Sequence, residues 1–428
     1  MIKKISFLLF FCGCFFSGYG QNGKPDLYIH PDFHTFQLYP AGQPQHVAAI
    51  SLGEAKALQL SYDDLSANTL PLNYTWVHCD RHWTPSSLLA SEYLEGFLEG
   101  QTSQGLLSFN TYQPYSHVSM TLPEESCMPR VSGNYYLLLY ESDPQEYLAK
   151  YPVVIYENLV GIQTSIHRTA PIELMKTHQE IDALADLTNF SVQNPLEDVQ
   201  WSVLQNRDWT SLKSFKPRFL RNGYYDFDYN GGENSFPGNT IFRFVDSKNI
   251  PVPTLRIPRY ELLDLWHAFV LEERPRGFDP FVNQDDARGA FVPRKQSANS
   301  DLEADYIILD IAVEDIEKSG QRALYVVGDF NQYQRKEEFQ LIYDAAVGKY
   351  VGQLFIKQGY LEYHLAEWNG DIQQWDYSFT EGNHWNCPNE YTSFLYLREW
   401  GQRFDRVIGF GQTFTNGMLG INVQISAP

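Results

Sequence analysis

One stretch of the chain repeats the first half of a calcium-binding loop. Residues 226–231 read Asp-Phe-Asp-Tyr-Asn-Gly, so that oxygen-bearing side chains at Asp226 and Asp228 alternate with aromatic residues before a glycine. The bidentate glutamate that should complete such a loop is replaced by Pro237. An alternating strand that ends in a Gly-rich turn explains the same residues. We therefore expect no calcium ion here.

Two pairs of histidines have the spacing of the zinc ligands on a metalloprotease helix. His78 and His82 stand four residues apart, as do His30 and His34. Cys79 occupies the position that the general base would need, and the residues before His78 have the pattern of a strand. Residues four apart in a strand lie about 13 Å from each other, too far to share one zinc ion. We expect strand and turn histidines, and neither a metal nor a cofactor.

Other catalytic signatures are absent from the sequence. It contains no Gly-x-Ser-x-Gly elbow, no phosphate-binding loop and no His-Glu-x-x-His. Gly409-Phe410-Gly411 lacks the third glycine of a dinucleotide-binding loop, because Phe414 stands there. Acidic residues are abundant, but no pair stands out for glycoside hydrolysis. We therefore expect a protein that is not an enzyme and has no small-molecule substrate; a hydrolase with an unrecognised acidic site is an alternative.

The composition indicates a globular, acidic, β-rich protein. The 428 residues carry a formal charge of −20, and 43% are hydrophobic, which supports packed cores. Aromatic residues make up 15% against only 5 methionines, and 29 Gly and 23 Pro supply turns, a balance that favours sheets. So acidic a surface disfavours nucleic acid and anionic lipid as partners.

The N-terminus has the three parts of a secretory signal. A basic head (Lys3, Lys4) precedes an apolar run over residues 5–16, and small residues lead to a cleavage site before Gln21. Lipidation at Cys14 is an alternative to this cleavage. We expect a signal peptide over residues 1–20, export to the periplasm and no direct membrane insertion, since no later stretch is long and apolar enough to span a bilayer.

Three cysteines follow the expected signal peptide. They are Cys79, Cys127 and Cys387, an odd number. A bridge between Cys79 and Cys127 is one possibility in an oxidising compartment, and three small buried thiols are the other, which we favour.

Short alternating runs bounded by turn residues predict an all-β chain of tandem immunoglobulin-like or E-set-like β-sandwich domains. We expect three such domains, over residues 21–157, 158–295 and 296–428, with a linker in the polar stretch near residue 296. One short helix is expected within residues 85–96. Residues 180–187 have helix propensity, but we assign them to a strand.

Two segments are candidates for partner binding. Aromatic residues crowd the charged stretch 76–97, where Trp83, Tyr93 and Phe97 would be interface anchors if exposed and ordinary core if buried. Residues 327–333 and 357–363 resemble the strand-and-turn signature of glycogen- and starch-binding sandwich modules. In those modules an aromatic platform stacks on sugar rings, and Phe330 and Tyr333 are the corresponding candidates here, with a shared sandwich core as the plainer explanation.

A wider resemblance covers nearly the whole chain after the expected signal peptide. Its most specific block is Tyr74-Thr75-Trp76-Val77-His78-Cys79-Asp80-Arg81-His82-Trp83-Thr84-Pro85-Ser86, followed by residues 92–97 and 108–111. Further blocks are residues 133–136, 194–195, 203–206, 236–239, 242–244, 305–306, 328–331, 357–360 and 389–391. In these blocks the chain is similar to the type IX secretion system plug proteins of the Bacteroidota.

The resemblance implies a function without chemistry. It implies a non-enzymatic periplasmic protein that seals the periplasmic opening of the SprA-type outer-membrane translocon barrel and makes a reversible interface with it. The family has no catalytic or ligand-binding residues to transfer to this sequence. The alternative function is a carbohydrate-binding accessory protein that uses its C-terminal sandwich domain.

Overall fold

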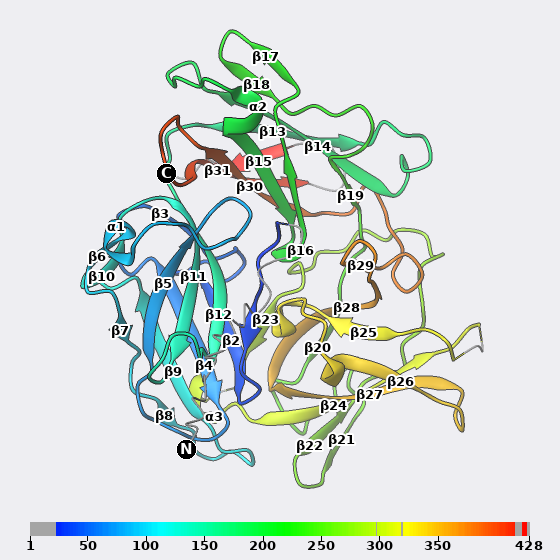
Figure 1. Ribbon diagram of the computed structural model, residues 1–428. Coiled ribbons are helices and arrows are strands. Elements are labelled where there is room, and N and C mark those ends of the chain that lie inside the picture. The colour runs from blue at the N-terminus through cyan, green and yellow to red at the C-terminus, as the bar shows by residue number, and fades with distance from the viewer. Residues whose placement is uncertain (1–22, 297, 318–319, 416–421, 426–428) are drawn as a thin grey trace, which may run out of the picture.

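The structure is a computed structural model that describes residues 23–296, 298–317, 320–415 and 422–425 (Figure 1). The expected signal peptide at residues 1–20 and the alternative of lipidation at Cys14 lie outside the described residues. Within these residues, no helix is long and apolar enough to cross a membrane. Strands dominate throughout, which confirms the predicted all-β fold of sandwich domains.

The first lobe (residues 28–156) is a sandwich of two sheets. Its elements are β1 (Tyr28–Ile29), β2 (Phe33–Pro40), β3 (Ala49–Ser51), β4 (Leu58–Asp64), β5 (Asn73–Cys79), α1 (Ala90–Tyr93), β6 (Leu94–Gly96), β7 (Gly100–Gln101), β8 (Leu106–Leu107), β9 (Ser116–Leu122), β10 (Cys127–Pro129), β11 (Gly133–Tyr140) and β12 (Ala149–Tyr156). One sheet has the order β1-β12-β11-β5-β7, with β3 beside β12, and the other the order β2-β4-β9-β8. Tyr62 and Trp76, one from each sheet, are buried in the core between them.

The helix expected within residues 85–96 is a single turn, α1. The chain leaves the helix at Leu94 because β6 pairs with β10 in a two-stranded ribbon. Gly96 ends this strand with a φ of +83°, and a Cβ there would lie 2.3 Å from the Ser126 carbonyl oxygen. Only glycine fits that turn without strain.

The second lobe (residues 162–237 and 390–425) is a sandwich built from two distant parts of the chain. Its elements are β13 (Ile162–Arg168), β14 (His178–Asp186), α2 (Pro195–Asp198), β15 (Val199–Gln205), β16 (Asp208–Phe215), β17 (Phe219–Arg221), β18 (Tyr224–Asp226), β19 (Ser235–Pro237), β30 (Glu390–Leu397), β31 (Arg406–Thr415) and β32 (Asn422–Ile425). One sheet is β13-β14-β18-β17, with β19 beside β14, and the other is β16-β15-β30-β31-β32. The strand assignment for residues 180–187 is confirmed by β14, whose Ile181, Ala183 and Ala185 alternate into the core and so override helix propensity.

The third lobe (residues 243–376) holds a ten-stranded sheet around one core. Its strands are β20 (Arg243–Asp246), β21 (Arg259–Leu262), β22 (Trp266–Phe269), β23 (Phe291–Pro293), β24 (Tyr306–Glu314), β25 (Leu324–Val327), β26 (Gln340–Asp344), β27 (Lys349–Lys357), β28 (Gly359–Asn369) and β29 (Gln374–Asp376). Its helical turns are α3 (Ser300–Glu303), η1 (Asp329–Asn331) and η2 (Glu337–Phe339).

The boundary expected between residues 295 and 296 does not match the sheets and is wrong. Strands β20 and β23, which precede it, pair with β28, and β22 pairs with β24. The C-terminal strand β30 returns to pair with β15 of the second lobe. Local composition does not show which distant segments pair. The polar stretch near residue 296, for which the composition predicts a linker, therefore lies inside the third lobe. The boundary at residue 157 coincides with the end of the first lobe's sheets.

The first and second lobes share a hydrophobic interface core. β11 is buried along its whole length because both of its faces are covered. Leu137 and Leu139 point into the core of the first lobe, whereas Tyr136 and Leu138 pack against the second lobe. Phe394 on β30 is one of the second-lobe residues that meet them. A shared cluster of buried apolar residues therefore joins the two lobes.

A buried polar cluster joins the first lobe to the third. Asp63, at the end of β4, accepts hydrogen bonds from Lys357 Nζ and from the Tyr306 hydroxyl, each at 2.7 Å. His117 Nδ1 lies 2.7 Å from its other oxygen, and Lys357 Nζ lies 4.1 Å from the centre of the Tyr115 ring. Asp63 is 0% and Lys357 1% exposed. Removing either charge while the lobes stay together would leave the other buried without a partner, which is strongly unfavourable.

Candidate functional site

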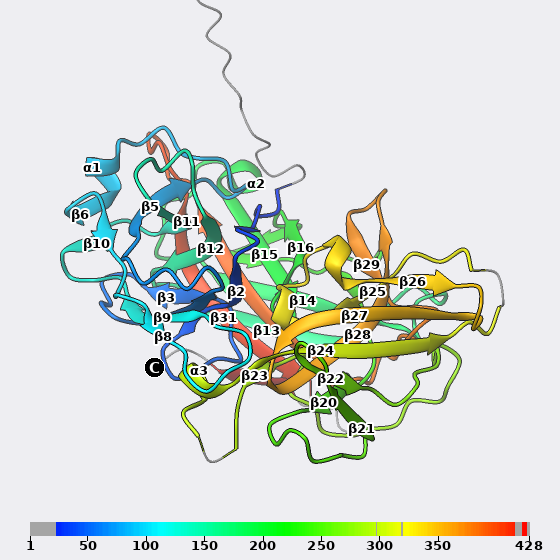
Figure 2. The same cartoon turned by 90° about the horizontal axis from the view of Figure 1, so that it is seen from below.

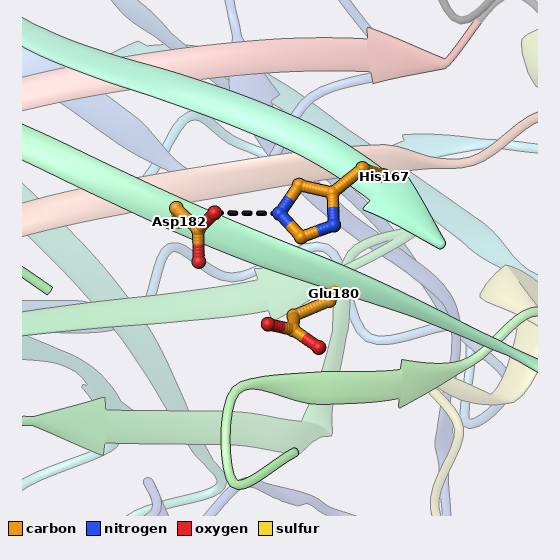
Figure 3. Close-up of side chains that lie close together, drawn as sticks. All are labelled: His167, Glu180 and Asp182. Carbon is orange, nitrogen blue, oxygen red and sulfur yellow. Dashed lines mark hydrogen bonds and ion pairs between the residues drawn. The ribbon is translucent and has the colours of Figure 1, made fainter. Parts of the chain in front are cut away.

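Three metal-ligating side chains lie together on the outer face of the second lobe (Figure 3). His167 on β13 stands directly opposite Glu180 on β14, and Asp182 follows two residues later on the same face. One ligand atom from each of the three lies within 4.8 Å of the others. Among the described residues, these three side chains form the one group of three or more His, Cys, Asp or Glu residues close enough together to hold a metal ion.

The cluster is arranged as an ion pair around the imidazole of His167. Its Nδ1–H donates to the Arg168 carbonyl oxygen at 3.0 Å, and its Nε2 lies 2.6 Å from Asp182 Oδ2. That hydrogen bond to Asp182 raises the pKa of His167 to about 9. Glu180 accepts hydrogen bonds from the Thr169 hydroxyl and the Ala170 amide, each at 2.8 Å. The residue types suit a divalent cation, but the imidazolium already supplies the positive charge, so we assign no chemistry to this cluster.

The histidines with zinc-like spacing do not converge. His78 is buried, which lowers its pKa to about 4, while His82 is exposed. His34 packs on the rings of Tyr306 and Phe355 at the boundary between lobes, whereas His30 lies partly exposed beside Asp32. In the calcium-like segment, burial and then the neighbouring carboxylates of Asp182, Asp226 and Glu180 raise the pKa of Asp228, so this segment borders the His167 cluster. Sequence reasoning missed that cluster, because only cross-strand pairing brings its members together.

Two aromatic candidates from the first lobe are internal. Trp83 is 1% exposed and belongs to the interface core between the first and second lobes, where its ring meets Trp209 at 5.2 Å. Tyr93 is 8% exposed and packs on Tyr135 within the first lobe. Of the two alternatives, exposed anchor and ordinary core, the structure shows core for both. An aromatic residue amid charge fits an interface between lobes as well as one between proteins.

Of the sugar-platform candidates in the third lobe, Tyr333 is buried and Phe330 is partly buried. Tyr333 is 3% exposed, and Phe330 packs edge-on against Phe339 at 5.2 Å. The segment around them joins all three lobes. Asp329 pairs with Arg207 of the second lobe at 3.3 Å, and Gln332 Oε1 accepts a hydrogen bond from the Tyr151 hydroxyl of the first lobe at 2.7 Å. Burial removes the support for a carbohydrate-binding function, because a ring must be exposed to stack on a sugar.

Phe97 is the one aromatic candidate on the surface, with 70% of its area exposed. It begins a run of exposed apolar side chains between β6 and β9, which we call the apolar rim: Phe97, Leu98, Leu106, Leu107, Phe109 and Tyr112. In Figure 1 the strands β6, β7 and β8 follow one another along the outer edge of the first lobe. Exposed apolar residues that gather on one side of a protein are typical of protein–protein interfaces. Binding of a partner by Phe97 stays a prediction.

The cysteines Cys79, Cys127 and Cys387 are free and buried in the structure. This agrees with the prediction of three buried thiols and not with a bridge between Cys79 and Cys127. Burial raises the pKa of all three thiols, which disfavours the reactive thiolate. They therefore act as small core residues.

Comparisons with known proteins place the first lobe in a family and show the fold of the whole. Residues 33–157 match the family described as "Type 9 secretion system plug protein 1st domain". The crystal structure of a hypothetical protein from Parabacteroides merdae ATCC 43184 is similar to the chain, with 22% identity and a TM-score of 0.85. The match covers 91% of this chain and 98% of that one. No curated protein matches the chain.

Proposed function

We propose that the chain is a periplasmic plug that seals the inner opening of an SprA-type outer-membrane translocon, because residues 33–157 match the first domain of the type IX secretion system plug proteins. The family match is the observation that carries this proposal. The role needs shape and rigidity rather than a reactive group. Three features of the structure support the proposal: the size of the molecule, the contacts between its lobes and its exposed apolar residues.

The size of the molecule suits a very wide pore. A barrel of about 36 strands, the largest known, has a backbone diameter near 70 Å when its strands tilt by about 40°. A compact body of about 400 residues has a radius of gyration near 21 Å, which corresponds to a width of about 55 Å. One such body fills most of the opening, after side chains that line the barrel are allowed for.

The lobes are joined in a way that resists deformation. The first and second lobes share the interface core that contains Trp83, and Arg81 Nε donates to Asp405 Oδ1 across the same boundary at 2.8 Å. The first and third lobes are held by Asp63 and Lys357. A domain that moved on its own hinge would open a gap, so a stopper benefits from contacts of this kind. Arg81, Trp83 and Lys357, which stand in blocks that resemble the family, therefore make contacts between the lobes of the protein.

The apolar rim is the surface we assign to the translocon. Release must remain possible, so we expect a standard interface of about 1,200–2,000 Å² in which a few apolar anchors are surrounded by polar contacts. Phe97, Leu107 and Phe109 supply such anchors on an otherwise acidic protein. The plug would act without catalysis.

The proposal is tested by deleting the gene and measuring the entry of a bulky antibiotic such as vancomycin. An open barrel should sensitise the cells, and expression of the wild-type protein should restore resistance. A variant with Leu255→Ser, a change at an exposed apolar residue of the third lobe outside the apolar rim, serves as the control and should restore resistance equally. Unchanged sensitivity in the deletion strain would contradict the proposal.

A further inference from the structure

A cleft of about 460 Å³ opens between the second and third lobes, beside the segment that precedes the first lobe. Lys24 comes from the first described residues, Trp209 from the start of β16, and Gln334, Arg335, Lys336 and Trp368 from the third lobe. In Figure 2 the first described segment, in dark blue, runs beside β16. We call these six residues the junction cleft. Pockets of this volume are the size of small-ligand and peptide sites.

The junction cleft is cationic in a protein whose net charge is −20. In the described part of the chain, neither Lys24 nor Arg335 forms an ion pair, and Lys336 reaches only Glu338 at 3.9 Å. Asp26, the one acidic residue that lines the cleft, is engaged by Lys150 at 3.0 Å. Asp208 and Glu338 attract Lys24 and Lys336 from beside the cleft, but among the residues that line it three cations face the single carboxylate of Asp26.

Burial makes this arrangement costly for the lysines. Desolvation lowers the pKa of both Lys24 and Lys336 below the ordinary lysine value. Lys24 Nζ is held by the carbonyl oxygens of Thr210, at 2.5 Å, and Gln373, at 3.3 Å, which are neutral groups. A carboxylate that entered the cleft would replace the lost hydration of both ammonium groups.

Unsatisfied hydrogen-bonding atoms line the same cleft. Gln334 Nε2 donates to the Leu27 carbonyl oxygen at 2.5 Å, but its Oε1 is buried and has no partner. The hydroxyl of Thr210 is also buried without a partner. Buried polar atoms are normally paired. An acceptor such as Gln334 Oε1 calls for a hydrogen-bond donor, which a peptide backbone N–H can supply.

We propose that the junction cleft binds an acidic peptide segment of a partner protein. Its carboxylates would pair with Lys24, Arg335 and Lys336, one of its backbone N–H groups would donate to Gln334 Oε1, and its apolar atoms would lie against Trp209. The volume admits about three residues. The large negative charge of the whole protein disfavours a long polyanion such as nucleic acid. This inference goes beyond the plug function and stands on the cleft alone.

The test titrates the purified protein with N-acetylated, C-amidated tetraglutamate and follows calorimetric heat and tryptophan fluorescence. We expect saturable binding that weakens at least tenfold in the double variant Arg335→Gln/Lys336→Gln. The charge-conserving Lys336→Arg should stay within about threefold of the wild type. Lys216→Gln, which removes an exposed lysine paired with Glu197 away from the cleft, should stay within about twofold. Equal thermal midpoints would show that the variants are folded.

Three outcomes would overturn the proposal. One is the absence of saturable binding at millimolar tetraglutamate. Another is equal binding of the neutral tetraglutamine peptide, which would show that charge is not recognised. The third is binding of inorganic phosphate, weakened by the same double variant, when tetraglutamate does not bind; this would assign the junction cleft to a phosphate-bearing ligand instead.

Discussion

Replacing Asp63 by asparagine tests the bonding of the first lobe to the third. The substitution keeps the shape of the side chain but removes the charge that Lys357 Nζ contacts at 2.7 Å. Since Lys357 is 1% exposed, its ammonium group cannot recover its hydration without separating the lobes. Breaking one side of a buried ion pair costs about 3–5 kcal/mol. The Tyr306 hydroxyl and the His117 ring lose their charged partner as well, which places the expected loss at the upper end of this range.

The assay is equilibrium unfolding in urea, compared with two further variants. The double variant Asp63→Asn/Lys357→Met removes both charges and should recover more than half of the loss, because no buried charge is then unpaired. Lys216→Gln breaks the exposed pair with Glu197 and should cost less than about 1 kcal/mol. A loss below about 1 kcal/mol for Asp63→Asn alone would refute the reasoning that this cluster locks the lobes.

Three other variants address the remaining parts of the structure. Trp83→Ala should destabilise the protein by about 3–5 kcal/mol and expose the linker between the first two lobes to limited proteolysis, since it empties the centre of the interface core; an unchanged digestion pattern would count against that core. His167, whose pKa Asp182 raises from 6.5 to about 9, should stabilise the fold fully below about pH 6.5 and progressively less as the pH rises through about 9. Its half-exposed side chain limits the effect to about 1 kcal/mol, and an equal pH dependence of unfolding in His167→Gln would exclude it. The pair Phe97→Ser/Leu107→Ser should leave the free energy of unfolding within about 0.5 kcal/mol and yet fail to restore vancomycin resistance in the deletion strain; full restoration would exclude the apolar rim as the translocon surface.

Local sequence patterns predicted the strands well because each strand carries its own burial signal. The alternation in residues 58–62 places Leu58, Leu60 and Tyr62 on one face, and these residues form the core of the first lobe. The continuous apolar run of β11 indicates a strand that is covered on both faces, and the second lobe provides the second cover. Such patterns depend only on neighbours in the chain.

The arrangement of lobes could not be predicted in the same way. Nothing near β30 indicates that it returns to β15, about 190 residues earlier, because any strand edge of suitable length could pair with it. The burial of Trp83 and Tyr333 depends on the same distant contacts. The aromatic, charge-flanked surroundings of Trp83 left an interface and a core both open, and the structure places Trp83 in the core between the first and second lobes. Tyr333, a candidate sugar platform, packs in a cluster of the third lobe. The pairing of Asp63 with Lys357 likewise joins residues whose types, taken singly, indicate an ordinary exposed surface.

Plugging itself is tested most directly by the electrical conductance of the purified translocon in a planar bilayer. The protein is added to the side that corresponds to the periplasm, with the Asp63→Asn variant as the comparison. Our account predicts that the wild-type protein closes the channel reversibly and that the variant closes it less completely. A conductance that stays at the open level when the wild-type protein is present in large excess would contradict it.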